Sequence, residues 1–263
     1  MTRLRLNLKE SSPIKMSMIV RIVRIVAVVV SIGLLHYGQP QASELPSHSS
    51  VKEHPSNSHK AAMELLAGTR GKIESLRTLR AKIVQQKSLS MLLSPVVSEG
   101  EFLYKKGAKF VWHYLPPDES VTVSDGSRVW LYYPAFSRAE LYDLKRFKKK
   151  SRLFDKLCLG FERPLCDLSD SFFIDLICSD ESTFEVSLKP KDEGMGRLIR
   201  EFYIRIDRVT GLPVQFRSFE KGGDETTISL HDVKVNEPLD DKLFVFVPPP
   251  GVVVVEAQGS LSY

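Results

Sequence analysis

The fold is decided by the stretch GEFLYKKGAKFVWHY, residues 100–114. Side chains alternate along it, so that Phe110, Trp112 and Tyr114 fall on one face and Val111 falls on the other. Alternation with a period of two is typical of β-strands that bury one face. The stretch therefore predicts two neighbouring strands with an aromatic face.

The same pattern continues on both sides of this stretch. Strands are predicted over 119–124 and 128–133, and Asp125-Gly126 between them is the sequence that a type I′ turn favours. Turns rich in Gly and Pro separate further strands over 197–207, 214–219, 226–235 and 243–247. About ten to eleven strands follow one another without long crossover helices. The sequence predicts a mainly β chain with some α, an α+β protein built as an antiparallel meander that is curved or nearly closed.

Helical periodicity occurs in two other places. Over 59–75 the apolar positions form a single stripe. Between 147 and 180 two short helices are predicted, one behind Ser151 and one behind Ser169-Asp170. The apolar faces of these short helices are Leu153, Phe154 and Leu157 in the first, and Phe172, Phe173 and Leu176 in the second. An apolar helix face must be buried, and the aromatic face of the sheet is the surface available to cover it.

The net charge of +5 is concentrated at the N-terminus. Residues 1–42 hold six basic residues and one acid, which leaves 31 basic and 31 acidic residues in the remainder. A neutral remainder has no overall field that would attract a phosphate backbone. We therefore expect no nucleic-acid partner.

The N-terminal region has the order of an export signal. Arg21 and Arg24 precede an apolar run over 25–35, and a small, polar stretch follows. We predict a signal peptide over 1–42, with an uncleaved membrane anchor as the alternative, a flexible linker over 43–58, one domain over 59–256 and a tail over 257–263. No cysteine precedes Cys158, so a lipid anchor directly after the leader is not predicted.

The sequence offers little catalytic chemistry. It contains no G-x-S-x-G, H-E-x-x-H, Walker or G-x-G-x-x-G motif, and its only histidines after residue 59 are His113 and His231. We therefore predict neither an enzyme nor a cofactor nor a metal site. Cys158, Cys166 and Cys178 leave two alternatives open, a disulfide among them or buried thiols.

The aromatic strands allow two interpretations. One is a plain aromatic core. The other is a cavity for an apolar ligand, because a long sheet with few helices to cover it leaves apolar surface to fill. The residues that we predict to line such a cavity are Phe102, Tyr104, Phe110, Trp112, Tyr114, Trp130, Tyr132, Phe202 and Ile204.

Three segments resemble the LolA family of periplasmic lipoprotein carriers. They are the F-x-W hairpin over 100–113, the stretch over 117–134 with its S-D-G turn and W-x-Y-x-P exit, and the F-x-F-x-P-P-x-G-V end over 243–252. The resemblance implies an incomplete antiparallel β-barrel whose hydrophobic cavity is capped by helices. The family usually has Arg-Pro after the first strand of the hairpin, where the Arg latches the lid. Lys106 and Gly107 stand there in this chain, so Lys106 is the residue at the latch position.

The resemblance also implies a function and a set of partners. A family member is a monomeric periplasmic chaperone that takes acylated lipoproteins from an inner-membrane ABC-type exporter. It passes them to an outer-membrane receptor or to the outer membrane. The alternative is a regulatory protein of the same fold that senses lipid or lipoprotein in the cell envelope.

Overall fold

The computed structural model describes residues 57–143 and 161–256. The predicted leader, most of the predicted linker and the C-terminal tail lie outside the described residues. So does the first short helix, with Leu153, Phe154 and Leu157.

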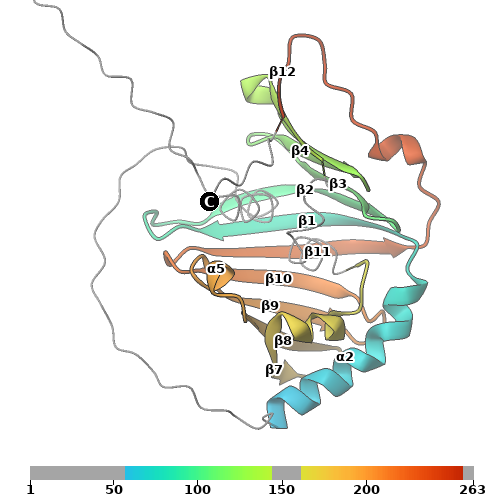
Figure 1. Ribbon diagram of the computed structural model, residues 1–263, viewed down its shortest axis with the longest axis vertical. Helices are drawn as coiled ribbons and strands as arrows, with labels where there is room; N and C mark the ends of the chain where they lie inside the picture. Colours follow the sequence, from blue (N-terminus) through green and yellow to red (C-terminus); the bar gives the residue numbers. More distant parts are fainter. Residues whose placement is uncertain (1–56, 144–160, 257–263) are drawn as a thin grey trace, which may run out of the picture.

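The described residues form one twelve-stranded sheet in the order β12-β6-β5-β4-β3-β2-β1-β11-β10-β9-β8-β7 (Figure 1). Its strands are β1 (Thr78–Ser88), β2 (Val96–Lys105), β3 (Lys109–Tyr114), β4 (Ser120–Asp125), β5 (Arg128–Tyr133), β6 (Arg138–Asp143), β7 (Phe172–Ser179), β8 (Thr183–Pro190), β9 (Ile199–Asp207), β10 (Pro213–Glu220), β11 (Glu225–Val235) and β12 (Val253–Glu256). The sheet is open, since β12 lies at one end and β7 at the other. The prediction of a mainly β, incompletely closed antiparallel sheet is confirmed. Among the described strands, only β12 runs parallel to its neighbour, β6.

Two meanders make up this sheet, and one long strand pair joins them. The strands β1–β6 follow each other in hairpins, as do β7–β11. The joint is the antiparallel pairing of β1 with β11, which runs from Leu79 opposite Val235 to Ser88 opposite Glu225. Strand β1, over 78–88, is not among the strands predicted from the sequence.

The sheet has one apolar face, here called the inner face, and one face with many charges, the outer face. Residues directly opposite each other on paired strands share a face. Ala81, Phe102, Trp112 and Leu131 occupy one such row, and all four are buried. The outer face carries ion pairs, among them Arg217 Nη2 to Glu185 Oε2 at 2.9 Å.

Helix α2 (Asn57–Ser75) covers the inner face at the β7 end of the sheet (Figure 1). The predicted stripe is confirmed for Ala62, Leu66, Thr69 and Ile73, which are buried. The helix begins two residues earlier than predicted, so the linker does not extend to residue 58. Its two ends are held by the sheet: Ser58 Oγ donates to Leu176 O at 2.9 Å, and Lys72 Nζ donates to Val209 O at 2.7 Å.

The prediction of a second short helix over 172–177 is wrong, because β7 occupies these residues. Phe172 and Leu176 face inward, while the Phe173 side chain is 58% exposed on the outer face. The apolar pairs of this segment fit a helical period as well as an alternating one. Pairing with β8 satisfies the backbone of the strand and decides between the two periods. The helical turns nearby are η2 (Leu165–Asp170) and α5 (Glu193–Gly196).

The prediction of a strand over 243–247 is also wrong. The chain there forms η3 (Asp241–Phe244) and then continues without regular structure across the outer face. Phe244 is buried there with Leu103 and Leu239. Asp241 receives hydrogen bonds and charge from Lys109 and Lys105, which hold the pKa of its carboxyl below the usual value.

The turn between β4 and β5 is shifted by one residue from the prediction. Gly126 and Ser127 are its two loop residues, and of the two only Gly126 has a positive φ, 88°. Asp125 is the last residue of β4, and its Oδ1 accepts from Ser127 N and Arg128 N at 2.7 Å. The side chain thus closes the turn as an acceptor. After β5, the short turn η1 (Pro134–Phe136) leads into β6.

Gly100 provides a test of how closely β2 and β3 approach each other. A Cβ at this position would lie 2.1 Å from the carbonyl oxygen of His113. We expect Gly100→Ala to lower the free energy of unfolding by about 1–3 kcal/mol, because backbone must move to relieve the clash. The control is Gly222→Ala, where an added Cβ meets nothing within 4 Å. If both variants unfold at the same urea concentration, an added Cβ at residue 100 does not destabilise the pairing of β2 with β3.

Candidate functional site: the apolar inner face

The aromatic residues predicted to line a cavity lie mostly together on the inner face. Phe102, Tyr104, Phe110, Trp112 and Tyr114 belong to one buried cluster, in which the rings of Phe102 and Trp112 are 4.3 Å apart. Phe202 and Ile204 belong to a second cluster, under α2.

The two clusters form one continuous surface. Phe216 on β10 packs against both of them, so the apolar lining extends across both meanders.

Phe161 shows that the inner face is concave. Its ring centroid lies 5.4 Å from that of Phe102 on β2 and 6.2 Å from that of Phe216 on β10. Two strands, β1 and β11, separate β2 from β10. In a flat sheet β2 and β10 would lie roughly 14 Å apart, too far for one ring to contact both. The sheet therefore curves around Phe161.

Glu162 fixes Phe161 in this position. Its carboxylate accepts a hydrogen bond from Tyr104 Oη at 2.5 Å, from Gly107 N at 3.0 Å and from Ala108 N at 3.3 Å. Burial and the neighbouring carboxylate both raise the pKa of Tyr104, so its hydroxyl stays protonated and donates. One side chain thus connects the 161–164 segment to the β2–β3 turn.

Lys106, the residue at the latch position, lies in the same turn. Its Nζ donates to the carbonyl oxygen of Glu74, in the last turn of α2, at 2.8 Å. Its backbone N–H donates to Arg77 O, also at 2.8 Å. A lysine therefore makes one side-chain contact from the sheet to the end of the helix.

Two residues predicted for the cavity, Trp130 and Tyr132, lie on the outer face instead. Both rings pack on Phe246, at 5.4 and 5.3 Å. The reason is the two-residue β4–β5 loop, which pairs even-numbered positions with odd-numbered ones, as in Val123 opposite Trp130. The inward positions therefore change from even to odd numbers after this turn. The loop length was visible in the sequence, so tracing the faces through it would have found the change.

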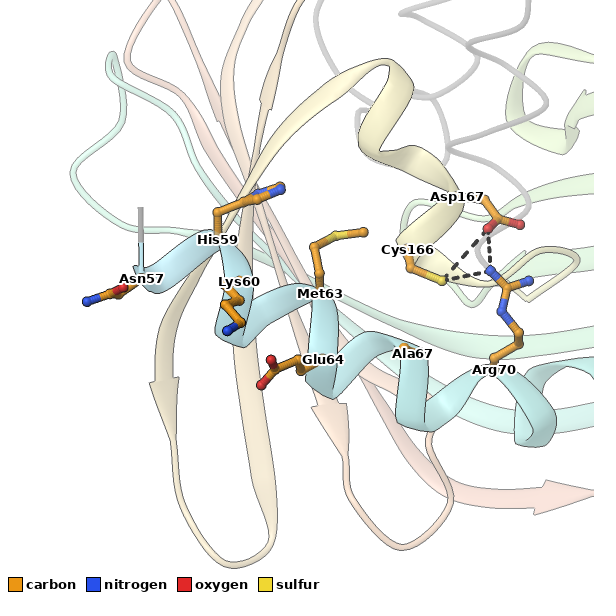
Figure 2. A pocket seen from close by; sticks show the side chains of 9 residues that line it. All are labelled: Asn57, His59, Lys60, Met63, Glu64, Ala67, Arg70, Cys166 and Asp167. Carbon is orange, nitrogen blue, oxygen red and sulfur yellow. Dashed lines mark hydrogen bonds and ion pairs between the residues drawn. The ribbon is translucent and has the colours of Figure 1, made fainter. Parts of the chain in front are cut away.

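A pocket of about 710 Å³ opens elsewhere, between α2 and η2 (Figure 2). None of the predicted cavity residues lines it. Figure 2 shows Arg70 pointing to Cys166 and Asp167, with its Nη2 2.7 Å from Asp167 Oδ1 and 3.2 Å from Cys166 Sγ. Burial raises the pKa of the Cys166 thiol. The pocket follows α2 from Asn57 to Arg70, and Cys166 and Asp167 of η2 line its other side.

The described ranges contain two cysteines and no group of metal-binding side chains. Cys166 and Cys178 are free thiols, so they do not form a disulfide with each other, and Cys158 lies outside these ranges. Within residues 57–143 and 161–256 no three metal-binding side chains gather into a group. No helix there has the length and apolar character needed to cross a membrane.

Several inner-face residues are not among those predicted from the sequence. Phe161 and Phe216 complete the aromatic lining, but neither lies in an alternating run with the other aromatics. Glu162 gave no signal, because its partners lie 54 to 58 residues away in the chain.

Comparison with known proteins gives the family of this chain. The family model described as outer membrane lipoprotein carrier protein LolA matches residues 74–247, more than half of the chain. The chain belongs to the LolA family. Among similar LolA-family relatives is the outer-membrane lipoprotein carrier protein of Pseudomonas paraeruginosa, 28% identical over 196 residues, which cover 74% of this chain and 88% of that protein. Its counterpart in Methylococcus capsulatus is 29% identical over 184 residues, 70% of this chain and 84% of that one.

Solved structures with similar folds include two proteins of low identity. A LolA superfamily protein from Nitrosomonas europaea has a TM-score of 0.39 and 12% identity, over 70% of this chain and 97% of its own. MucB has a TM-score of 0.45 and 14% identity, over 73% of this chain and 69% of its own.

The role of Glu162 can be tested without a ligand. In Glu162→Gln one oxygen acceptor replaces two, so the amides of Gly107 and Ala108 lose a charged partner. We expect faster hydrogen exchange at these two amides and a loss of about 1–3 kcal/mol in unfolding free energy. Asp167→Asn is a control acid, whose partner Arg70 lies away from the turn. If hydrogen exchange at the amides of residues 107 and 108 is unchanged in Glu162→Gln, Glu162 does not hold the β2–β3 turn.

Proposed function

We propose that this chain is a periplasmic carrier that holds the acyl chains of lipoproteins against its inner face. In this proposal it receives them from an inner-membrane ABC-type exporter and delivers them to the outer membrane or to a receptor there. It works as a monomer, by binding rather than by catalysis. The observation that carries the proposal is the concave aromatic face, which extends over both meanders of a LolA-family sheet.

The energetics of the cargo explain why such a surface is needed. Each methylene group that leaves water contributes about 0.8 kcal/mol, so one long acyl chain exposed to water costs near 10 kcal/mol. A carrier must cover the chains and still release them without nucleotide. Modest affinity and a cover that opens meet both needs. Residues 161–162 and α2, held through Glu162 and Lys106, are the described parts of such a cover.

Two phenylalanines on one strand test where the chains bind. Phe216 and Phe219 are both half-buried on β10, with Phe216 on the inner face and Phe219 on the outer face. We expect Phe216→Ala to weaken binding of a triacylated lipopeptide about tenfold, because it removes apolar contact from the lining. Phe219→Ala should leave this affinity unchanged. Binding is measured by isothermal titration calorimetry, and folding of each variant by thermal melting.

Native mass spectrometry of the exported protein tests the proposal as a whole. We expect a bound acylated species that lipase treatment removes. The purified complex should then release its lipoprotein to outer-membrane vesicles. Binding without any release would favour a sensor of lipoprotein over a carrier. An empty protein that binds no lipopeptide would refute both.

Lys106 should affect release more than stability. Its contact with Glu74 O lies at an exposed position, so Lys106→Ala removes little folding free energy, about 0.5–1.5 kcal/mol. We expect faster transfer of bound lipopeptide to acceptor vesicles, since the sheet then holds α2 less firmly. Lys82→Ala, which breaks a surface ion pair with Asp232, is the control. Transfer at the wild-type rate would exclude Lys106 as a latch.

A further inference from the structure

Three polar residues interrupt the apolar inner face in one row. Lys87 on β1 lies opposite Thr226 on β11, and Thr226 lies opposite Ser218 on β10. The row continues to Phe202 on β9. The polar side chains therefore cross the joint between the two meanders and end against the aromatic lining.

Two of these side chains are buried without a partner of their own. Lys87 is 7% exposed and Ser218 is 5% exposed. Among residues 57–143 and 161–256, the Oγ atom of Ser218 has no hydrogen-bond partner. Within the described part of the chain, Lys87 Nζ makes no hydrogen bond or ion pair, and its interactions with Glu220 and Asp224 are longer-range.

The two nearby acids do not neutralise Lys87 by direct contact. Asp224 is engaged in a turn, where its Oδ1 accepts from Ser90 N at 2.9 Å. Burial raises the pKa of Glu220 and lowers the pKa of Lys87. Gln85, the next inner-face residue of β1, already accepts from Tyr114 Oη at 2.8 Å.

A buried hydroxyl without a partner costs folding free energy, and so does a lysine side chain that packs into an apolar face with no ion pair at its Nζ. An apolar pair at these positions would pack against the lining at lower cost. Such exceptions call for an explanation other than stability, and a ligand that supplies oxygen acceptors provides one.

The position of the row fits a ligand with one polar end. Lys87 is the last inner-face residue of β1 before the loop over 89–95. From Lys87 toward the other end of the strand, the inner-face positions beyond Gln85 are Ile83, Ala81 and Leu79, all buried. A polar group at Lys87 would therefore place an attached acyl chain along apolar surface.

We propose that Lys87 and Ser218 form a donor site for the carbonyl oxygens that link the acyl chains of the cargo to its head. Lys87 Nζ and Ser218 Oγ donate to the ester oxygens, while the chains lie on the aromatic lining. This inference rests on the proposed function, because it assigns the polar part of the same ligand.

The test uses two matched lipopeptides. Both carry a glycerol thioether on an N-terminal cysteine, one with two palmitoyl esters and the other with two hexadecyl ethers, which lack the carbonyl oxygens. We expect the wild type to bind the ester about tenfold more tightly than the ether. Lys87→Met and Ser218→Ala should each weaken ester binding by about threefold to tenfold and leave ether binding unchanged.

Stability separates a binding role from a structural one. Ser218→Ala removes an unpaired buried hydroxyl, so its melting temperature should equal or exceed that of the wild type. Lys82→Met and Ser229→Ala are controls on the outer face of β1 and β11, and should bind both probes normally.

The outcomes distinguish this inference from the proposed function. Equal binding of ester and ether by the wild type and both variants would overturn the donor site while leaving lipid carriage intact. Failure of the wild type to bind either lipopeptide would overturn the proposed function itself. Ester binding that falls only in step with thermal stability would assign the two residues a structural role.

Discussion

The pairing of β1 with β11 is the constraint on which the remaining structure depends. It joins positions about 140 to 160 residues apart in the chain, such as Leu79 and Val235, and aligns the inner faces of two meanders that are otherwise local. Without this register, Phe161 could not contact Phe102 and Phe216 at once. Closing so long a loop costs chain entropy, which the continuous apolar face must offset.

Elements whose evidence is local could be predicted from the sequence. The hairpins within 100–133 and 199–235 each contain their own alternation and their own turn residues, so neither needs distant partners to be recognised. Helix α2 shows its buried stripe within five turns. The open, mainly β sheet follows from these pieces, because hairpins in sequence place neighbours beside each other.

The wrong predictions concern segments whose structure depends on residues elsewhere in the chain. The apolar pairs of 172–177 fit a helix or a strand. Backbone pairing with β8 makes the segment a strand. The 243–247 segment alternates like a strand, yet in the described structure it pairs with no strand and packs on the outer face by its side chains. Trp130 and Tyr132 changed face because of a loop two residues long.

Strand β1 was missed for a different reason. Its inner face reads Leu79, Ala81, Ile83, Gln85, Lys87, so the apolar pattern ends where the strand still continues. Local rules are broken most often where a site requires it. Lys87 interrupts the apolar alternation of β1. Together with Ser218 it places hydrogen-bond donors on the apolar inner face. The mismatch between pattern and structure at Lys87 therefore coincides with the polar row on which the proposed donor site rests.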